Sequence, residues 1–168
     1  LITLNYFILH SLAIRSLYLS SRADTPEREP ADGARPGVGI LVPAHDEAET
    51  ILDSIPSFEN LAYPNTEIIV IDDGSTDDTL DELREAYDLV ELEAIPEDVP
   101  CEPIRAVYQS RTNEDLRVVE KANGGKSDAL NAGIWLTEKP LFCAVDSDTI
   151  IQRGSLFAAT APVFDRPE

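Results

Sequence analysis

The chain has 168 residues, with 32 aspartates and glutamates against 13 lysines and arginines, so its formal net charge is −19. A surface this acidic offers no basic stripe to neutralise phosphates, which argues against a nucleic-acid-binding protein. Apolar residues make up 43% of the chain, enough for the core of one folded domain.

The acidic residues are spread along the chain from Asp24 to Glu168, and the basic residues are mostly arginines. A dispersed acidic surface keeps a protein hydrated in concentrated salt, where counter-ions screen the repulsion between carboxylates. The composition therefore favours a halophilic source. An ordinary acidic protein is the alternative.

The N-terminal residues 1–21 are largely apolar, and Arg15 is the first strongly charged residue among them. About 20 apolar residues are needed to cross a bilayer. The sequence has no methionine, so it does not begin at a natural start codon, and we expect it to be part of a longer chain whose preceding residues complete the span. We predict a transmembrane or membrane-anchor helix over 1–21. An amphipathic or core helix is the alternative.

The segment 22–37 is polar, contains three prolines and has no apolar periodicity, which indicates a flexible linker. Arginines follow the apolar segment at 15, 22, 28 and 35. By the positive-inside tendency they place the downstream domain on the cytoplasmic side of the cell membrane.

From residue 38 onward, short β-branched runs alternate with helical patterns, which predicts an α/β fold with a parallel or mixed sheet. We expect strands at 38–42, 67–71, 116–120 and 141–145, with a further candidate at 105–109. We expect helices over 46–55, from Ser75 or Thr76 to about Tyr87, and over 126–136. Pro56 should end or kink the first helix. The remainder of 88–113 should be an irregular excursion, because it contains three prolines.

Polar residues collect where the predicted strands end, which is where ligands bind in open α/β sheets. Four segments carry them: 43–47, 72–75, 121–126 and 146–148. If the strands run parallel, these four loops face one cleft. We therefore predict a single binding site there.

Two of these segments contain paired aspartates. Asp146 and Asp148 form a D-x-D that follows an apolar run, and such carboxylates suit Mg²⁺ or Mn²⁺ together with substrate phosphates. A solvated turn or helix cap is the alternative. Asp72 and Asp73 precede Gly74, and one of them suits a base or ribose, with a tight turn as the alternative.

The third segment, Gly124-Gly125-Lys126, joins a flexible loop to a predicted helix N-terminus. Such a position suits a phosphate, and Lys126 adds a positive charge. The spacing excludes a P-loop.

Four sequence segments, taken together, resemble the family 2 glycosyltransferases: VPAHDEAETI at 42–51, YPNTEIIVIDDGSTDDT at 63–79, VVEKANGGKSDALNAGI at 118–134 and FCAVDSDTI at 142–150. They are most similar to membrane-anchored polysaccharide synthases of the poly-N-acetylglucosamine, chitin and hyaluronan type. The resemblance covers about 38–157. It implies a GT-A (Rossmann-like) nucleotide-diphospho-sugar transferase fold, with 38–168 as its N-terminal, donor-binding part and an incomplete C-terminus.

The resemblance also implies an activity and a set of roles. A sugar would pass with inversion from a nucleotide diphosphate donor, usually a UDP-sugar, to a glycan or lipid-linked acceptor. The nucleoside pocket would be lined by Pro43, Ala44 and Glu47, and Asp73, with Asp72 nearby, would contact the uracil or ribose. Lys126 would help to hold the donor, Asp146 would approach the ribose or the metal, and Asp148 would be the main ligand of Mg²⁺ or Mn²⁺.

The family pattern also includes a general base in a later acidic motif, and no such motif precedes Glu168. We therefore assign no base, expect it beyond residue 168 and expect this chain alone to be inactive. Two other classes stay open. A sugar nucleotidyltransferase would need a Gly- and Arg-rich loop after the first strand, and a non-catalytic nucleotide-binding module would need no base. A phospho-receiver domain fits less well, because its acidic pair would follow the first strand.

Overall fold

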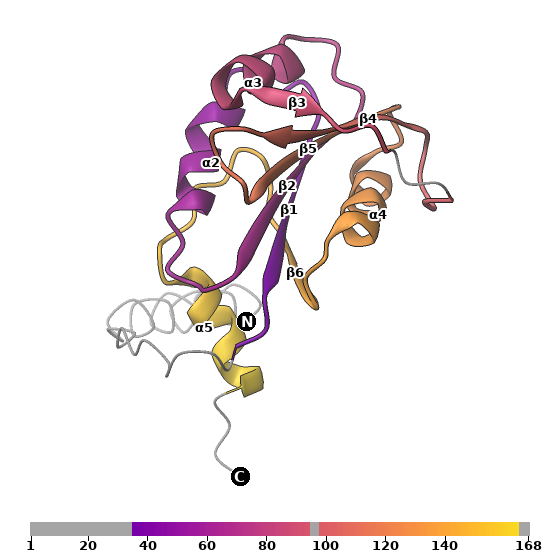
Figure 1. The fold of residues 1–168 in the computed structure, drawn as a ribbon. Coiled ribbons are helices and arrows are strands. Elements are labelled where there is room, and N and C mark those ends of the chain that lie inside the picture. Colours follow the sequence, from indigo (N-terminus) through magenta and orange to yellow (C-terminus); the bar gives the residue numbers. More distant parts are fainter. Residues whose placement is uncertain (1–34, 95–97, 165–168) are drawn as a thin grey trace, which may run out of the picture. The chain divides into compact units, whose positions relative to one another are not determined.

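The computed structural model describes residues 35–94 and 98–164 (Figure 1). The predicted membrane-anchor helix over 1–21 and nearly all of the linker 22–37 lie outside these residues. Within the described ranges, no helix is both long enough and apolar enough to span a membrane.

The described residues form a six-stranded mixed sheet in the order β3-β4-β5-β2-β1-β6. Its strands are β1 (Val38–Ala44), β2 (Thr66–Asp72), β3 (Leu89–Glu91), β4 (Ile104–Ser110), β5 (Leu116–Lys121) and β6 (Leu141–Ala144). The four strands β5, β2, β1 and β6 run parallel, and β4 is antiparallel to both β5 and β3. This confirms the predicted mixed sheet, including the strand near 105–109.

Helices cover both faces of the sheet (Figure 1). They are α2 (Ile51–Glu59), α3 (Thr79–Tyr87), α4 (Lys126–Leu136) and α5 (Ser155–Phe164). Side chains alternate between the faces along each strand, so Ile68 and Val70 pack in the cluster that includes residues of α2, α3 and α5. Ile69 and Ile71 pack instead in the cluster that includes Ala129 and Ala132 of α4. The continuous apolar runs are therefore strands that are buried on both faces.

The first helix begins later than the sequence predicts. Asp46 has a left-handed backbone, with φ of 56°, and α2 begins only at Ile51. The helix then continues through Pro56 to Glu59, so of the two outcomes expected at Pro56, an end or a kink, the end at Ile55 is wrong. Pro56 is exposed, whereas Ile55 and Phe58 are fully buried, so packing of the inner face offsets the hydrogen bond that proline cannot donate.

Two other expectations differ from the structure. α3 begins at Thr79 with Asp78 at its N-cap position, not at Ser75 or Thr76, because those two residues contact the β1–α2 loop. An apolar run such as 141–145 is typical of a strand buried inside a sheet, but β6 lies at the end of the sheet and Phe142 is 51% exposed. Helix α5 has no counterpart among the predicted elements.

Candidate functional site

A pocket of about 290 Å³ opens where the parallel strands end. Its lining comes from the last residues of β1, from the loops that follow β1, β2 and β6, and from the N-terminus of α4. The lining residues are Pro43, Ala44, His45, Glu47, Asp73, Lys126, Asp146, Ser147 and Asp148. The structure thus confirms that the four polar segments meet at one pocket, because the parallel register brings the carboxyl ends of β1, β2 and β6 to the same edge.

Asp72 is the one candidate residue that does not line this pocket. It is 2% exposed, and its Oδ1 accepts a hydrogen bond from the backbone N–H of Ser75 at 3.1 Å. Burial raises the pKa of its carboxyl group, and the hydrogen bonds from Ser75 only partly oppose that effect. Asp72 therefore stabilises the turn after β2 through its hydrogen bond with Ser75 and does not face the pocket.

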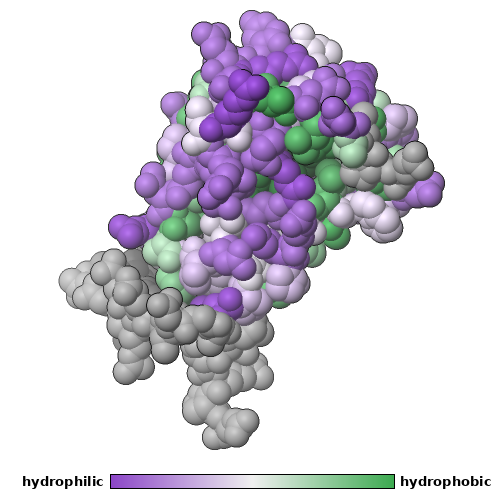
Figure 2. All heavy atoms as spheres, in the orientation of Figure 1, coloured by the Kyte–Doolittle hydropathy of each residue, from purple (hydrophilic) through white to green (hydrophobic). Residues whose placement is uncertain are grey.

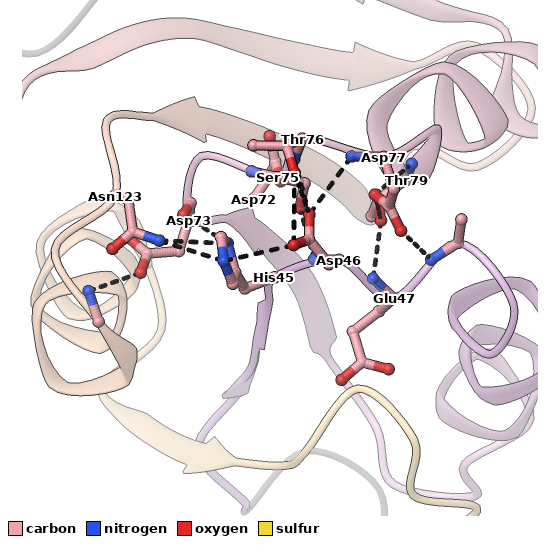
Figure 3. A network of polar contacts seen from close by, with 12 residues as sticks. His45, Asp46, Glu47, Asp72, Asp73, Ser75, Thr76, Asp77, Thr79 and Asn123 are labelled. Carbon is pink, nitrogen blue, oxygen red and sulfur yellow. Dashed lines mark hydrogen bonds and ion pairs between the residues drawn. The ribbon is translucent and has the colours of Figure 1, made fainter.

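Sequence reasoning assigned no role to His45, although it stands inside the first polar segment. Its Nδ1 lies 3.0 Å from the carbonyl oxygen of Asp73, and the amide Nδ2 of Asn123 lies 3.3 Å from its Nε2 (Figure 3). The same amide nitrogen lies 3.2 Å from Nδ1, so the imidazole ring is held between Asp73 and Asn123. His45 thus joins three of the loops that surround the pocket.

Asp73 is the most enclosed carboxylate of the pocket, with its side chain only 4% exposed. Its Oδ1 accepts hydrogen bonds from Lys121 Nζ at 2.5 Å and from the N–H of Gly124 at 3.1 Å. Its Oδ2 accepts from the N–H of Gly125 at 2.6 Å. Gly125 makes this contact with φ of 86°, a backbone conformation that favours glycine. A carboxylate has about four acceptor positions, so one position on Oδ2 is left for a ligand.

Besides Asp73 and Glu47, the pocket carries one cation and two further carboxylates. Lys126 Nζ forms an ion pair with Asp146 Oδ1, and both side chains are more than half exposed. Asp148 is exposed in the same loop. The ion pair is worth little in water, so an arriving phosphate or cation can displace either partner.

Asp146, Ser147 and Asp148 supply oxygen ligands of the kind that Mg²⁺ and Mn²⁺ prefer. These ions commonly bind one or two carboxylates and complete their coordination shell with phosphate oxygens and water. No group of three or more His, Cys, Asp or Glu side chains within the described residues is arranged to hold a metal alone. Asp146 and Asp148 would therefore hold a divalent ion only jointly with a ligand's oxygens.

The loops after β1 and β2 are joined by a set of reciprocal hydrogen bonds, which we call the loop latch (Figure 3). Three consecutive backbone N–H groups, those of residues 46–48, donate to side chains of the β2–α3 segment at 2.8–3.1 Å; the acceptors are Ser75, Thr79 and Asp77. In return, Asp46 Oδ1 accepts from the N–H of Thr76 at 2.6 Å. The latch fixes the segment that presents Pro43, Ala44 and Glu47 to the pocket.

The hydrogen bond from the Thr76 N–H lowers the pKa of Asp46 below its ordinary value of 3.8. A carboxylate with a lowered folded-state pKa contributes stability above its unfolded pKa and loses it as the pH falls through the folded value. The Asp46 carboxylate is therefore ionised, and able to accept the Thr76 N–H, at neutral pH.

We expect Asp46→Ala to loosen the loop latch, because it removes the acceptor for Thr76 and places alanine at a φ of 56°. Hydrogen–deuterium exchange should show several-fold faster exchange of the Thr76 and Asp77 amides. Asp46→Asn retains one acceptor oxygen and tolerates the left-handed backbone, so it should exchange nearly as slowly as the wild type. Equal protection of Thr76 in all three proteins would contradict this role.

Comparison with known proteins identifies the family. The family model for glycosyl transferase family 2 matches residues 39–167. Among curated proteins, the poly-β-1,6-N-acetyl-D-glucosamine synthase of Staphylococcus epidermidis is 30% identical over 122 residues, which is 72% of this chain and 24% of that protein. The probable glycosyltransferase YdaM of Bacillus subtilis is 29% identical over 127 residues, 73% of this chain and 25% of that protein. The chain thus spans about a quarter of the length of these relatives.

Solved structures show the same fold. S. aureus TarS 1–349 in complex with UDP-GlcNAc matches with a TM-score of 0.56 and 24% identity, covering 77% of this chain and 31% of that one. The mannosyltransferase PcManGT from Pyrobaculum calidifontis, in complex with GDP-Man and Mn²⁺, matches with a TM-score of 0.55 and 25% identity, covering 83% and 37%.

The described residues therefore form a mixed α/β sheet whose structural neighbours are Rossmann-like GT-A glycosyltransferases. The chain belongs to glycosyl transferase family 2.

Proposed function

We propose that this chain is the donor-binding part of an inverting, metal-dependent glycosyltransferase whose donor is a UDP-sugar. One observation carries the proposal: a single pocket joins an enclosed carboxylate, Asp73, to a cation at a helix N-terminus and a D-x-D loop. These three parts suit, in order, a nucleoside, a diphosphate and a divalent ion. The ligands named for the structural neighbours, UDP-GlcNAc, UDP and GDP-Man, support a nucleotide-sugar donor.

Each end of the donor would meet a different part of the pocket. Pro43, Ala44 and Glu47 would line the nucleoside, and Asp73 would accept a hydrogen bond from the uracil or ribose through the acceptor position left on Oδ2. Asp72 would act indirectly, by stabilising the turn after β2 that carries Asp73. Lys126 begins α4, so its ammonium and the positive end of the helix would attract the diphosphate together.

A divalent ion, Mg²⁺ or Mn²⁺, would be held by Asp148 and Asp146 with the donor's phosphate oxygens. When bound, it offsets the charge that builds on the departing diphosphate. Lys126 adds to this from the protein side, once the phosphate draws it away from Asp146. The Mn²⁺ named with PcManGT supports a divalent metal.

The acceptor would be a glycan or a lipid-linked sugar. We assign no residue of this chain as the base that deprotonates the acceptor hydroxyl. The apolar segment 1–21 would anchor the protein in the cell membrane with the transferase domain on the cytoplasmic side. The apolar composition of that segment and the arginines that follow it support this placement.

Titration calorimetry of the purified protein tests the donor site. We expect UDP and UDP-GlcNAc to bind, to bind at least tenfold more tightly with Mn²⁺ than with EDTA, and to bind more tightly than GDP. Equal binding of UDP with Mn²⁺ and with EDTA, and no preference for UDP-GlcNAc over UMP, would favour a non-catalytic nucleotide-binding module. Failure of every nucleotide to bind at millimolar concentration would overturn the proposal.

A further inference from the structure

Lys121 is a charged residue in the interior that the proposed function does not use. It is the last residue of β5, its side chain is 0% exposed, and it follows Val119 on the face of the sheet that α4 covers. Asp73 is the first residue after the neighbouring strand β2, two residues beyond Ile71, which faces α4. The two charges therefore lie side by side beneath the N-terminus of α4.

All three protons of the Lys121 ammonium have acceptors nearby. Nζ lies 2.5 Å from Asp73 Oδ1, 2.7 Å from Asp128 Oδ2 and 2.6 Å from the carbonyl oxygen of Ala122. Burial lowers the pKa of Lys121, but the hydrogen bonds and charges of Asp128 and Asp73 outweigh burial, so the pKa is raised overall. Lys121 is thus a cation at neutral pH.

Asp128 ties this cation to two further segments. It lies in the first turn of α4, and its carboxylate accepts the backbone N–H of Glu102 at 3.0 Å. A Cβ at Gly124 would come within 2.3 Å of Asp128 Oδ2, so only glycine lets the loop between β5 and α4 pass this close. The contacts among Lys121, Asp73 and Asp128 hold the loop between β5 and α4 against the Asp73 carboxylate. They thereby fix the position of Lys126, which follows that loop.

Stability alone does not account for such a network. Desolvating two carboxylates and an ammonium is costly, and apolar residues of similar volume often stabilise a fold as well or better. What apolar residues cannot do is hold the Asp73 carboxylate in one orientation, with Oδ1 fully occupied and one position on Oδ2 left over.

We propose that Lys121 and Asp128 are positioning residues for donor binding: they fix the Asp73 carboxylate and the Gly124–Gly125 loop in the orientation that accepts the nucleoside. This inference rests on the proposed function. It assigns Lys121 no contact with the donor itself.

The same strand offers a matched control. Arg117, near the other end of β5, forms an ion pair with Glu67 and is only 16% exposed. Glu67 and Arg117 lie at the amino ends of β2 and β5, far along the strands from the pocket. Removing either cation breaks a mostly buried ion pair between β2 and β5, but only one of these pairs reaches Asp73.

The test compares Lys121→Met, Asp128→Asn and Arg117→Met by thermal unfolding and by calorimetry with UDP and Mn²⁺. We expect all three to lower the melting temperature. UDP binding should weaken at least tenfold in Lys121→Met, about three- to tenfold in Asp128→Asn and less than twofold in Arg117→Met. The amides of Gly124 and Gly125 donate to the Asp73 carboxylate, so their hydrogen–deuterium exchange should accelerate several-fold in Lys121→Met and Asp128→Asn but not in Arg117→Met.

Asp128→Asn retains the pair between Lys121 and Asp73, so it decides the matter if Lys121→Met does not fold. Wild-type UDP affinity in the folded variants, or an equal loss in Arg117→Met, would overturn the inference and leave the proposed function standing. Absence of UDP binding by the wild type would overturn both.

Discussion

Asp148→Ala should abolish the metal-dependent part of UDP binding while leaving the fold intact. Asp148 is exposed in the loop after β6, so its removal should change the free energy of unfolding by no more than about 0.5 kcal/mol. If Mn²⁺ tightens UDP binding tenfold in the wild type, the metal contributes about 1.4 kcal/mol. In the variant this contribution should vanish, so UDP should bind equally with Mn²⁺ and with EDTA.

The control for Asp148→Ala is a second exposed aspartate. Asp53 lies on α2, outside the pocket. Asp53→Ala changes the net charge of the protein by the same amount as Asp148→Ala. The Asp53→Ala protein should still bind UDP about tenfold more tightly with Mn²⁺ than with EDTA. Asp146→Ala is a poorer test, because it also releases Lys126 from its ion pair. An Asp148→Ala protein that retains a tenfold effect of Mn²⁺ would rule out Asp148 as the metal ligand.

The pocket could be anticipated from the sequence because each of its parts is local. A buried run such as EIIVI followed by Asp-Asp-Gly predicts a strand and the loop at its carboxyl end. Parallel strands then bring such loops to one edge. The positions of Asp73, Lys126 and Asp148 follow from this without knowledge of the strand order.

The element boundaries that were mispredicted are places where tertiary contacts override local pattern. Ala48 continues the apolar spacing of α2, yet its N–H donates to Asp77 in the loop latch and the helix starts at Ile51. Ser75 and Thr76 are good capping residues, but the same latch uses them. Both hydrogen-bond patterns join two segments that are far apart in the sequence, so the pattern of one segment alone does not predict them.

The role of Lys121 could not be predicted because it depends on which strands are neighbours. Only the placement of β2 beside β5 brings Lys121 to Asp73, and that order is absent from the local pattern. A lysine at the end of a strand is normally exposed. Its burial here is the strongest sign that Asp73 belongs to a larger network.

Asp73→Asn should be the most destabilising conservative substitution in the pocket. It halves the negative charge that surrounds the buried Lys121 ammonium, and breaking such a pair costs about 3–5 kcal/mol. It also turns an amide donor toward the N–H of Gly125, which lies 2.6 Å from Oδ2. Urea unfolding at neutral pH should show the loss, and UDP binding should fall with it.

The neighbouring residue supplies a control with the opposite sign. Burial raises the pKa of Asp72, so the folded state binds its proton more tightly, and stability falls as the pH rises from the unfolded pKa of 3.8 through the folded value. Asp72→Asn removes that penalty and keeps an oxygen to accept the N–H of Ser75. At neutral pH it should therefore be neutral or stabilising. Equal destabilisation by the two substitutions would mean that burial, and not the pairing with Lys121, determines the contribution of these carboxylates to stability.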